Sequence, residues 1–370
     1  MSEVSMFDRL NARIITPYVD NNIWRLKEKG STVTQIKSVF HESKIKVYYP
    51  EMNLEKLLKT NPSHYEFFCH LFTSYIFEIK KAILEPDFGW VILEPFTIFK
   101  FSFPMVHDPW DIKKRRPSTV NFLSPNKKKI YLEEAISIKY AWQNYYHFFI
   151  DTLSQLFLLE ENGIPNHIPI VVPNKFPSIK YVQEFLKLST FVKRRIIIQK
   201  PNEYYHIQKL ILCKDTFQSD SVFKVVESID LIRNCEKNDR LFIFRPLEDG
   251  RSILNFSEIE KTVVKYGFRV VDSSKMTLEQ QIILFSGASE IIGVHGAGLT
   301  NIIFRSGHPL KFLEIFPGAE LTPEHYRNLS QKMGFKYSHI LGDGFLKNNL
   351  KNFNLSKTSL EEKMISFFDF

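Results

Sequence analysis

The sequence predicts an α/β protein whose last third forms a parallel, doubly wound sheet. Short apolar runs alternate there with amphipathic stretches, as strands and helices do in such sheets. The predicted strands cover residues 240–246, 269–274, 289–294 and 309–317. Three helices are predicted to begin at capping boxes, which are Ser257 with Glu260, Thr277 with Gln280, and Ser359 with Glu362. A parallel sheet also predicts where a ligand binds, at the carboxyl ends of the strands.

The residues before this part repeat the alternation less regularly. Residues 140–163 are typical of a strand end followed by a helix, 168–173 of a buried strand, and 177–189 of a helix that begins with a proline. Residues 216–239 are polar and irregular, so we expect a domain linker there. The expected division is into an N-terminal domain, a C-terminal domain and a last helix, over 1–225, 226–357 and 358–370.

The chain of 370 residues is basic, with a net charge of +8 and a pI near 9.1. Such a balance favours anionic partners. The basic clusters Lys113–Arg116 and Lys127–Lys129 are either solvated loops or a patch that docks on anionic lipid. No nucleic-acid-binding motif accompanies the charge, so nucleic acid is not an expected partner.

Cysteine usage and hydropathy favour a cytoplasmic protein without a membrane span. Cys69, Cys213 and Cys235 are widely spaced, so neither a disulfide framework nor a zinc ribbon is expected. The first residues lack the apolar core of a signal peptide, and no stretch approaches the roughly 20 apolar residues that span a bilayer. We expect a cytoplasmic location and leave open a peripheral attachment to the inner face of the membrane.

The most informative motif is IIGVHGAGLTN at residues 291–301. A buried strand is predicted to end near Val294, and the small residues after it would let a ligand reach backbone N–H groups. A helix expected from Leu299 points its positive end at the same place. This arrangement suits a diphosphate, although a tight turn whose histidine caps a local group would also explain the motif. The candidate ligand-binding residues of the motif are His295, Gly296, Ala297, Gly298 and Leu299.

Further polar residues are expected on the same rim. Arg245 ends a strand, and Arg251 and Asn255 follow in the next loop and helix start. Arginine binds phosphate oxygens in a bidentate manner, but each arginine alone could equally form a surface ion pair. Glu314 lies at the end of another strand, where a carboxylate either accepts hydrogen bonds from the two hydroxyls of a ribose or pairs with a lysine.

The first half of the chain offers one candidate for proton transfer. In NYYHFFID, His147 and Asp151 are four residues apart and therefore share one helix face. That face is apolar, so an ionised Asp151 needs a partner or a cleft, from which it could take a proton from an acceptor hydroxyl. A core histidine with a helix-capping aspartate is the alternative. The sequence holds no DxD, HExxH or GxSxG motif, so neither a metal site nor a nucleophilic triad is expected.

Two stretches of the sequence together resemble glycosyltransferase family 61. They are NYYHFFIDTLSQL at 144–156 and EQQIILFSGASEIIGVHGAGLTNIIF at 279–304, with the rim arginines and Asn255 between them. The likeness extends over about Tyr140–Pro317 and is strongest at HGAGLTN. In one departure, Ser154 and Gln155 stand where the family often has Pro-Arg. If that arginine holds donor or acceptor in relatives, this chain does so differently.

The resemblance implies a GT-B-type fold, in which two Rossmann-like domains face each other across a cleft and the last helix crosses back onto the first domain. The second domain would bind a sugar donor linked to UDP or another nucleoside diphosphate, with no further cofactor and no metal. Transfer would invert the anomeric carbon, and the rim would stabilise the departing diphosphate. Asp151 would deprotonate the acceptor, with His147 orienting it or acting as the base itself. Asn301 would brace the turn or contact phosphate.

The expected partners are the nucleotide-sugar donor and a glycan or lipid-linked glycan acceptor, in capsule or lipopolysaccharide synthesis. The sequence does not identify the sugar, the nucleobase or the oligomeric state. Two other interpretations are a non-catalytic sugar-nucleotide or polysaccharide-binding protein with a degenerate site, and a two-domain sugar epimerase. The intact polar residues of the rim argue against the first, and HGAGLTN argues against the second.

Overall fold

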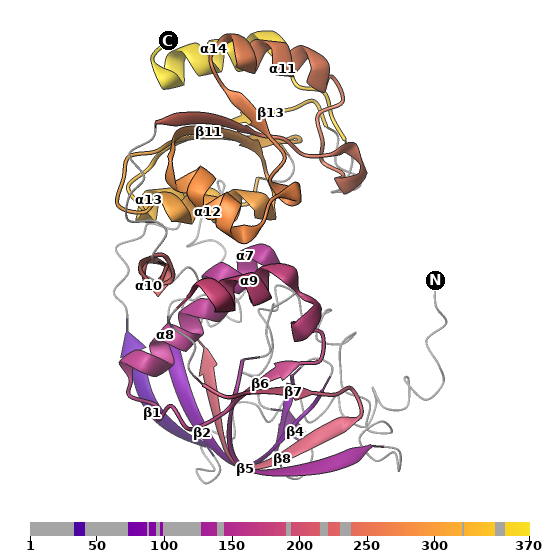
Figure 1. The fold of residues 1–370 in the computed structure, drawn as a ribbon, viewed down its shortest axis with the longest axis vertical. Helices are drawn as coiled ribbons and strands as arrows, with labels where there is room; N and C mark the ends of the chain where they lie inside the picture. Colours follow the sequence, from indigo (N-terminus) through magenta and orange to yellow (C-terminus); the bar gives the residue numbers. More distant parts are fainter. Residues whose placement is uncertain are drawn as a thin grey trace, which may run out of the picture.

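The structure is a computed structural model, and it describes residues 33–40, 73–86, 89–93, 97–98, 127–138, 144–189, 194–214, 221–229, 238–319, 322–344 and 352–370. The basic cluster Lys113–Arg116 and the cysteines Cys69 and Cys235 lie outside these residues. Two α/β units lie one above the other, with helices of both units between the two sheets (Figure 1). The expected two-part α/β architecture is confirmed.

Within the described residues, the N-terminal unit has a sheet of eight strands in the order β4-β3-β2-β8-β5-β6-β7, with β1 also paired to β2. Strands β8, β5, β6 and β7 pair in parallel, whereas β1 to β4 add an antiparallel extension next to β8. Only the parallel half is therefore Rossmann-like. The strands are β1 (Val33–Phe40), β2 (Thr73–Leu84), β3 (Val91–Leu93), β4 (Thr97–Ile98), β5 (Lys128–Ser137), β6 (Ile170–Pro173), β7 (Ile196–Gln199) and β8 (Glu203–Lys214).

The helices of this unit gather on the side of its sheet that faces the other unit (Figure 1). They are α7 (Tyr145–His147), the π-helical turn η2 (Phe148–Thr152), α8 (Leu153–Glu161), the 3-10 turn η3 (Phe176–Ser178), α9 (Lys180–Leu188) and α10 (Ser221–Glu227). The predicted helix before Gly163 is present, and Gly163 follows it with a φ of 68°. A π-helical turn, which the sequence did not predict, interrupts it because the N–H of Leu153 bonds to the carbonyl of Phe148.

Helix α10 corrects the expected linker over 216–239. Its side chains Val222, Val225 and Val226 are buried and pack with α8 and the rest of the core. The segment forms a helix because three valines at helical spacing make one apolar face. The domain boundary expected between residues 225 and 226 falls inside this helix.

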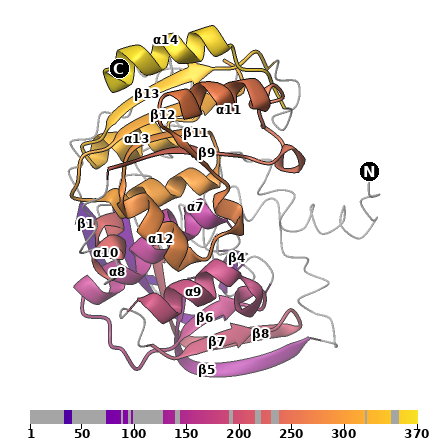
Figure 2. The same cartoon turned by 45° about the horizontal axis from the view of Figure 1, so that its top comes forward.

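In the C-terminal unit, the described residues form a five-stranded sheet in the order β10-β9-β11-β12-β13, parallel throughout. The strands are β9 (Asp239–Ile243), β10 (Arg269–Val271), β11 (Ala288–Val294), β12 (Lys311–Phe316) and β13 (Lys336–Leu341). The helical segments are η5 (Leu247–Asp249), α11 (Phe256–Lys265), η6 (Ser273–Lys275), α12 (Leu278–Ser286), η7 (Ala297–Arg305), α13 (His325–Lys332) and α14 (Lys357–Phe368). Helices lie on both faces of this sheet (Figure 2), so the doubly wound prediction is confirmed.

One of the three predicted capping boxes is confirmed. Thr277 accepts a hydrogen bond from the N–H of Gln280, whose side chain bonds back to the N–H of Thr277. The other two predictions were wrong by two or three residues, because α11 is capped by Asn255 and α14 by Ser356.

Helix α14 stays on its own unit, contrary to the expected crossing onto the first domain. Leu360, Met364 and Phe368 are buried in one cluster with Ile259 and Val263 of α11 and with the outer face of the C-terminal sheet. In Figure 1, α14 and α11 lie on the far side of the C-terminal sheet from the N-terminal unit. The physical reason is that the apolar stripe of α14 is satisfied by α11 and the strands beside it.

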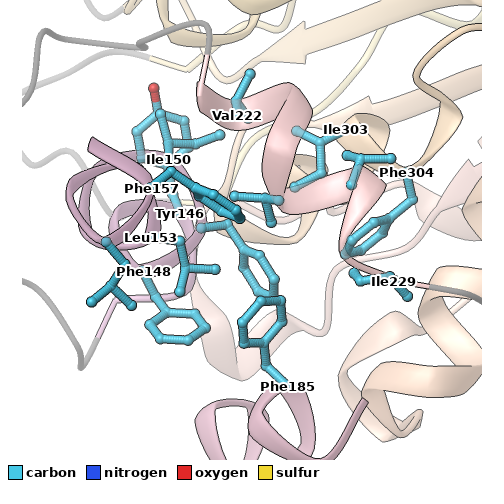
Figure 3. Close-up of a cluster of buried hydrophobic side chains, with 14 of the residues drawn as sticks. Tyr146, Phe148, Ile150, Leu153, Phe157, Phe185, Val222, Ile229, Ile303 and Phe304 are labelled. Atoms are coloured by element: carbon cyan, nitrogen blue, oxygen red, sulfur yellow. The ribbon is translucent and has the colours of Figure 1, made fainter. Parts of the chain in front are cut away.

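The two units share a hydrophobic core. Figure 3 shows part of one cluster that contains Phe148, Phe185 and Val222 of the N-terminal unit together with Ile303 and Phe304 of η7. The ring centroids of Phe149 and Phe304 lie 5.8 Å apart in an edge-to-face arrangement. The facing sides of the two units are thus packed against each other through buried apolar side chains.

Candidate active site

A pocket of about 280 Å³ lies between the two units. The C-terminal unit lines it with the residues that follow β9, β10 and β11, and α7 and α9 of the N-terminal unit close it. Open parallel sheets bind ligands at this edge, as the sequence predicted. The volume is near the lower end of the roughly 300–1,000 Å³ typical of small-molecule sites.

Arg245 lies in the pocket wall, just past the end of β9. Its Nε donates to the carbonyl of Gly250 at 2.6 Å and its Nη2 to the carbonyl of Asp249 at 3.0 Å. Burial lowers the pKa of Arg245, and the nearby charge of Arg251 lowers it further. In the described part of the chain Arg245 makes no ion pair with a carboxylate, so its charge is available to an anion.

Arg251 adds a second cation next to Arg245. Its φ of 57° lies in the left-handed region, which is unfavourable for a residue with a side chain and concentrates at functional sites. Burial also lowers its pKa, and its Nε is buried without a hydrogen-bond partner in the described residues. Arg251 does not line the pocket itself. Of the two predicted arginines, Arg245 therefore lines the pocket, whereas Arg251 is close to Arg245 without lining it.

The HGAGLTN loop supplies the wall beside Arg245. Gly296 and Gly298 line the pocket, and η7 begins at Ala297, two residues before the expected helix start. A Cβ on Gly296 would collide with the Nη1 atom of Arg245, so a side chain there would occupy the space of the guanidinium group. The Gly296 carbonyl accepts hydrogen bonds from the N–H of Leu299 at 3.0 Å and the Tyr326 hydroxyl at 2.6 Å, which fix the loop.

His295 is held by a buried carboxylate. Its Nδ1 lies 2.6 Å from Oε1 of Glu314, whose Oε2 accepts a hydrogen bond from the Tyr337 hydroxyl at 2.7 Å. Glu314 is fully buried and does not line the pocket. This corrects the expectation that Glu314 binds the hydroxyls of a ribose, because both of its oxygens are engaged and no ligand reaches them. The carboxylate instead orients the imidazole of His295.

Two asparagines have structural partners. The Oδ1 of Asn301 accepts a hydrogen bond from the Tyr145 hydroxyl at 2.5 Å, and its Nδ2 donates to Gln281 at 2.7 Å. Asn301 therefore links α7 of the N-terminal unit to α12 of its own unit, a role that differs from the two that the sequence suggested. The amide of Asn255 bonds to both backbone groups of Leu355, and Asn255 does not line the pocket. Its predicted contact with the donor is thus not made from this position.

His147 and Asp151 form a close pair on the N-terminal unit. The His147 Nδ1 and Asp151 Oδ2 atoms are 2.5 Å apart, and the side chains keep 24% and 10% of their surfaces exposed. The π-helical turn places Asp151 among buried residues, with the carbonyl of Asp151 accepting the hydroxyl of Ser154. Neither residue lines the pocket. Tyr146 connects the pair to the second unit, since its ring lies 5.3 Å from that of His147 and 5.2 Å from that of His325.

The structure adds residues that the sequence did not single out. Tyr326 is buried between Gly296 and the two arginines, and burial raises its pKa strongly. His325 stacks on His295 with ring centroids 6.3 Å apart. Both precede or begin α13, a polar segment without a recognisable motif. Asp272 and Tyr181 line the pocket as well. Asp272 lies within the predicted strand 269–274 and directly after the observed β10, and its place near a strand end is a signal that could have found it.

Two searches of the described residues bear on metal and membrane chemistry. No group of three or more histidine, cysteine, aspartate or glutamate side chains there is arranged to hold a metal ion. No helix in the same residues is long and apolar enough to cross a membrane.

Residues 145–309 match the family model of glycosyltransferase 61. A search among curated proteins finds no match. Among solved structures, the chain is similar to the E. coli heptosyltransferase WaaC with ADP, at 11% identity and a TM-score of 0.31, over 64% of this chain and 98% of that chain. The family match spans both the His147–Asp151 pair and the HGAGLTN loop, so the part of the chain that carries the candidate site is similar to glycosyltransferase family 61.

Proposed function

We propose that the protein transfers a sugar from a nucleoside diphosphate donor to a glycan acceptor, with inversion and without a metal ion. The observation that carries this proposal is the pair Arg245 and Arg251, two partly buried cations beside the HGAGLTN loop that make no ion pair with a carboxylate in the described residues. Burying a charge without a partner is costly, so the site is built for an anion that arrives with its ligand. A diphosphate accepts bidentate hydrogen bonds from arginine and further hydrogen bonds from backbone N–H groups.

The leaving diphosphate would lie in the pocket against Arg245 and the HGAGLTN loop. As the bond from the anomeric carbon to the phosphate oxygen breaks, negative charge grows on the diphosphate, and fixed guanidinium groups and backbone dipoles stabilise it without reorganising. His295 directly precedes Gly296 but does not line the pocket, so its role, held by Glu314, would be to fix the start of the loop. The protein groups would thereby supply the charge that a metal ion supplies in other transferases.

The acceptor would be activated by His147. Its side chain is more exposed than that of Asp151 and is oriented by it at 2.5 Å, so we assign His147 as the base and Asp151 as the residue that positions it. The acceptor oxygen would attack the anomeric carbon, its proton would pass to His147, and the diphosphate would leave from the opposite face. A single displacement of this kind inverts the anomeric configuration. A glycan of a capsule or lipopolysaccharide, made in the cytoplasm at the membrane face, is the acceptor class that we propose for this basic protein.

The arginine assignment is tested by calorimetric binding of pyrophosphate and nucleoside diphosphates. Arg245→Ala should weaken both by roughly 10-fold or more, because one charge-assisted bidentate contact is lost. Arg240→Ala is the matched control, since Arg240 lies at the other end of the same strand and pairs with Glu290 at 2.6 Å. Equal affinities for Arg245→Ala and the wild type would contradict the proposal.

The chemistry is tested in a transfer assay with a chelator and an NMR assignment of the product anomer. We expect full activity with chelator and the inverted anomer. His147→Ala and Asp151→Asn should lower kcat by about 10²–10⁴ while leaving the affinity for the nucleoside diphosphate near that of the wild type. Loss of activity with chelator, restored by Mg²⁺ or Mn²⁺, would overturn the metal-independent mechanism.

A further inference from the structure

The pocket wall carries both cations and carboxylates. Arg245 and Lys180 are its cations, and Asp249, Asp272 and Glu184 are its carboxylates. Carboxylates repel phosphate but accept hydrogen bonds from hydroxyl and N–H groups. A ligand that suits both kinds of group is anionic in one part and carries hydrogen-bond donors in another.

Asp272 lies one strand away from Arg245, the residue proposed to bind phosphate. It follows Val271 of β10, which pairs with Ile243 of β9, and the N–H of Phe244 bonds to the carbonyl of Val271 at 2.8 Å. Asp272 and Arg245 therefore follow the carboxyl ends of two adjacent parallel strands, whose backbones lie about 4.8 Å apart. A ribose joined to the diphosphate through its 5′ oxygen can span this distance.

One oxygen of Asp272 is positioned to accept from a ligand. Its Oδ1 already accepts from the N–H of Ser274 at 3.1 Å and from the Ser274 hydroxyl at 2.6 Å. Its Oδ2 is buried and has no hydrogen bond of good geometry, and its ion pair at 3.0 Å is with Lys275, whose side chain is 81% exposed. An exposed lysine gives way to a ligand at little cost.

Helix α9 of the N-terminal unit provides a flat surface on the other side. The ring of Tyr181 lies 5.0 Å from that of Tyr145 and 5.4 Å from that of Phe148, which fixes its orientation. Glu184 accepts the N–H of Leu278 at 2.9 Å, so α9 is tied to the C-terminal unit at the edge of the pocket. A fixed aromatic ring in a pocket wall is a stacking surface for a nucleobase.

We propose that Asp272 binds the ribose hydroxyls of the donor and that Tyr181 packs against its base, so that the nucleoside contacts both units. This inference rests on the proposed function and gives Asp272 the role that the sequence had suggested for Glu314. Because α9 belongs to the N-terminal unit, base selection would depend on both units and not on the C-terminal sheet alone.

The test compares affinities for matched ligands by calorimetry. Among UDP, ADP, GDP and CDP, the tightest binder is measured against its 2′,3′-dideoxy form and against pyrophosphate. The wild type should prefer the ribose form by roughly 10-fold or more, because a hydrogen bond to a charged group is lost in the dideoxy form. Asp272→Asn should abolish most of this preference while leaving the affinity for pyrophosphate unchanged. Asparagine keeps an oxygen for Ser274, so the turn should be retained, which a thermal melt verifies.

Asp249→Asn is the matched control, since it removes the same charge from the same pocket on the Arg245 side. It should keep the preference for ribose. Tyr181→Ala should weaken the nucleoside diphosphate but not pyrophosphate, whereas Tyr181→Phe should bind as the wild type does.

The outcomes separate the two proposals. If the wild type binds the nucleoside diphosphate and Arg245→Ala does not, but Asp272→Asn keeps the full preference for ribose, the inference about Asp272 is overturned and the proposed function stands. If the wild type binds neither pyrophosphate nor any of the four nucleoside diphosphates, both are overturned.

Discussion

Gly296 illustrates how a missing side chain determines the chemistry of the pocket. Its φ of 171° is extended backbone that any residue adopts, so conformation does not require glycine here. The lack of space does require glycine, because the Nη1 atom of Arg245 occupies the position that a Cβ would take. The small residues of HGAGLTN thus admit a protein cation close to the loop as well as a ligand.

Gly296→Ala should therefore displace the guanidinium group of Arg245 and weaken nucleoside diphosphate binding by about 10-fold, the value of one lost charged contact. The melting temperature should change little, because the arginine can move away from the new methyl group. Gly298→Ala is the control in the same loop, since its Cβ would approach Ser273 Oγ only to 3.4 Å. Titration calorimetry measures both. If Gly296→Ala bound the nucleoside diphosphate as tightly as the wild type, the observed position of Arg245 would not be required for binding.

The sequence pointed to Arg245 and to Gly296, Gly298 and Leu299 of the HGAGLTN loop, which line the pocket, but not to the contacts that hold the residues around them. His295 and Glu314 both stood out at strand ends, yet their contact depends on the register of β11 and β12, in which Gly293 pairs with Glu314. Register between parallel strands is set by packing along the whole sheet, so a single strand does not reveal it. Asp272 and Tyr181 belong to different units, and only the folded structure shows that they line the same pocket.

At the level of elements, burial decided which parts of the sequence were predictable. Strands β9, β11 and β12 carry long buried runs, and their apolar patterns located them closely. Strand β13 lies at the edge of the sheet, alternates exposed and partly buried residues, and was missed. Helix α10 was missed because the residues around it are polar, and α14 was found but assigned to the wrong unit. An apolar stripe predicts that a helix packs, not against what it packs.

The packing of α14 predicts that substitutions at Met364 and at its neighbour Ile365 differ in their effect on stability. Met364 is fully buried against the outer face of the C-terminal sheet, whereas Ile365 is 44% exposed. Met364→Ala should lower the free energy of unfolding by about 2–5 kcal/mol, because it removes buried groups and leaves a cavity. Ile365→Ala should cost much less. Denaturant unfolding followed by far-UV circular dichroism measures both, and equal effects would mean that α14 is not packed as described.

For the molecule as a whole, the shared core between the units determines how it unfolds. One cluster of buried residues runs from Ile136 of the N-terminal sheet through the helices between the sheets to Phe312 of the C-terminal sheet. Hydrogen bonds from Tyr145 to Asn301 and from the Leu278 N–H to Glu184 cross the same boundary. Separating the units would expose this apolar surface to water, so neither unit should unfold alone.

The chain should therefore unfold in a single transition, and its tryptophans allow a direct test. Trp90 is buried directly before β3 of the N-terminal unit, so in a variant that keeps Trp90 as its single tryptophan the fluorescence reports on that unit. Met364→Ala, made in that variant, removes packing from the cluster on the outer face of the C-terminal sheet, to which Trp90 does not belong. In a cooperative molecule it should nonetheless shift the fluorescence transition and the circular dichroism transition to lower denaturant by the same amount. A fluorescence midpoint that stays at the wild-type value while circular dichroism shows an earlier step would mean that the units are independent domains, with the donor pocket between them open to change.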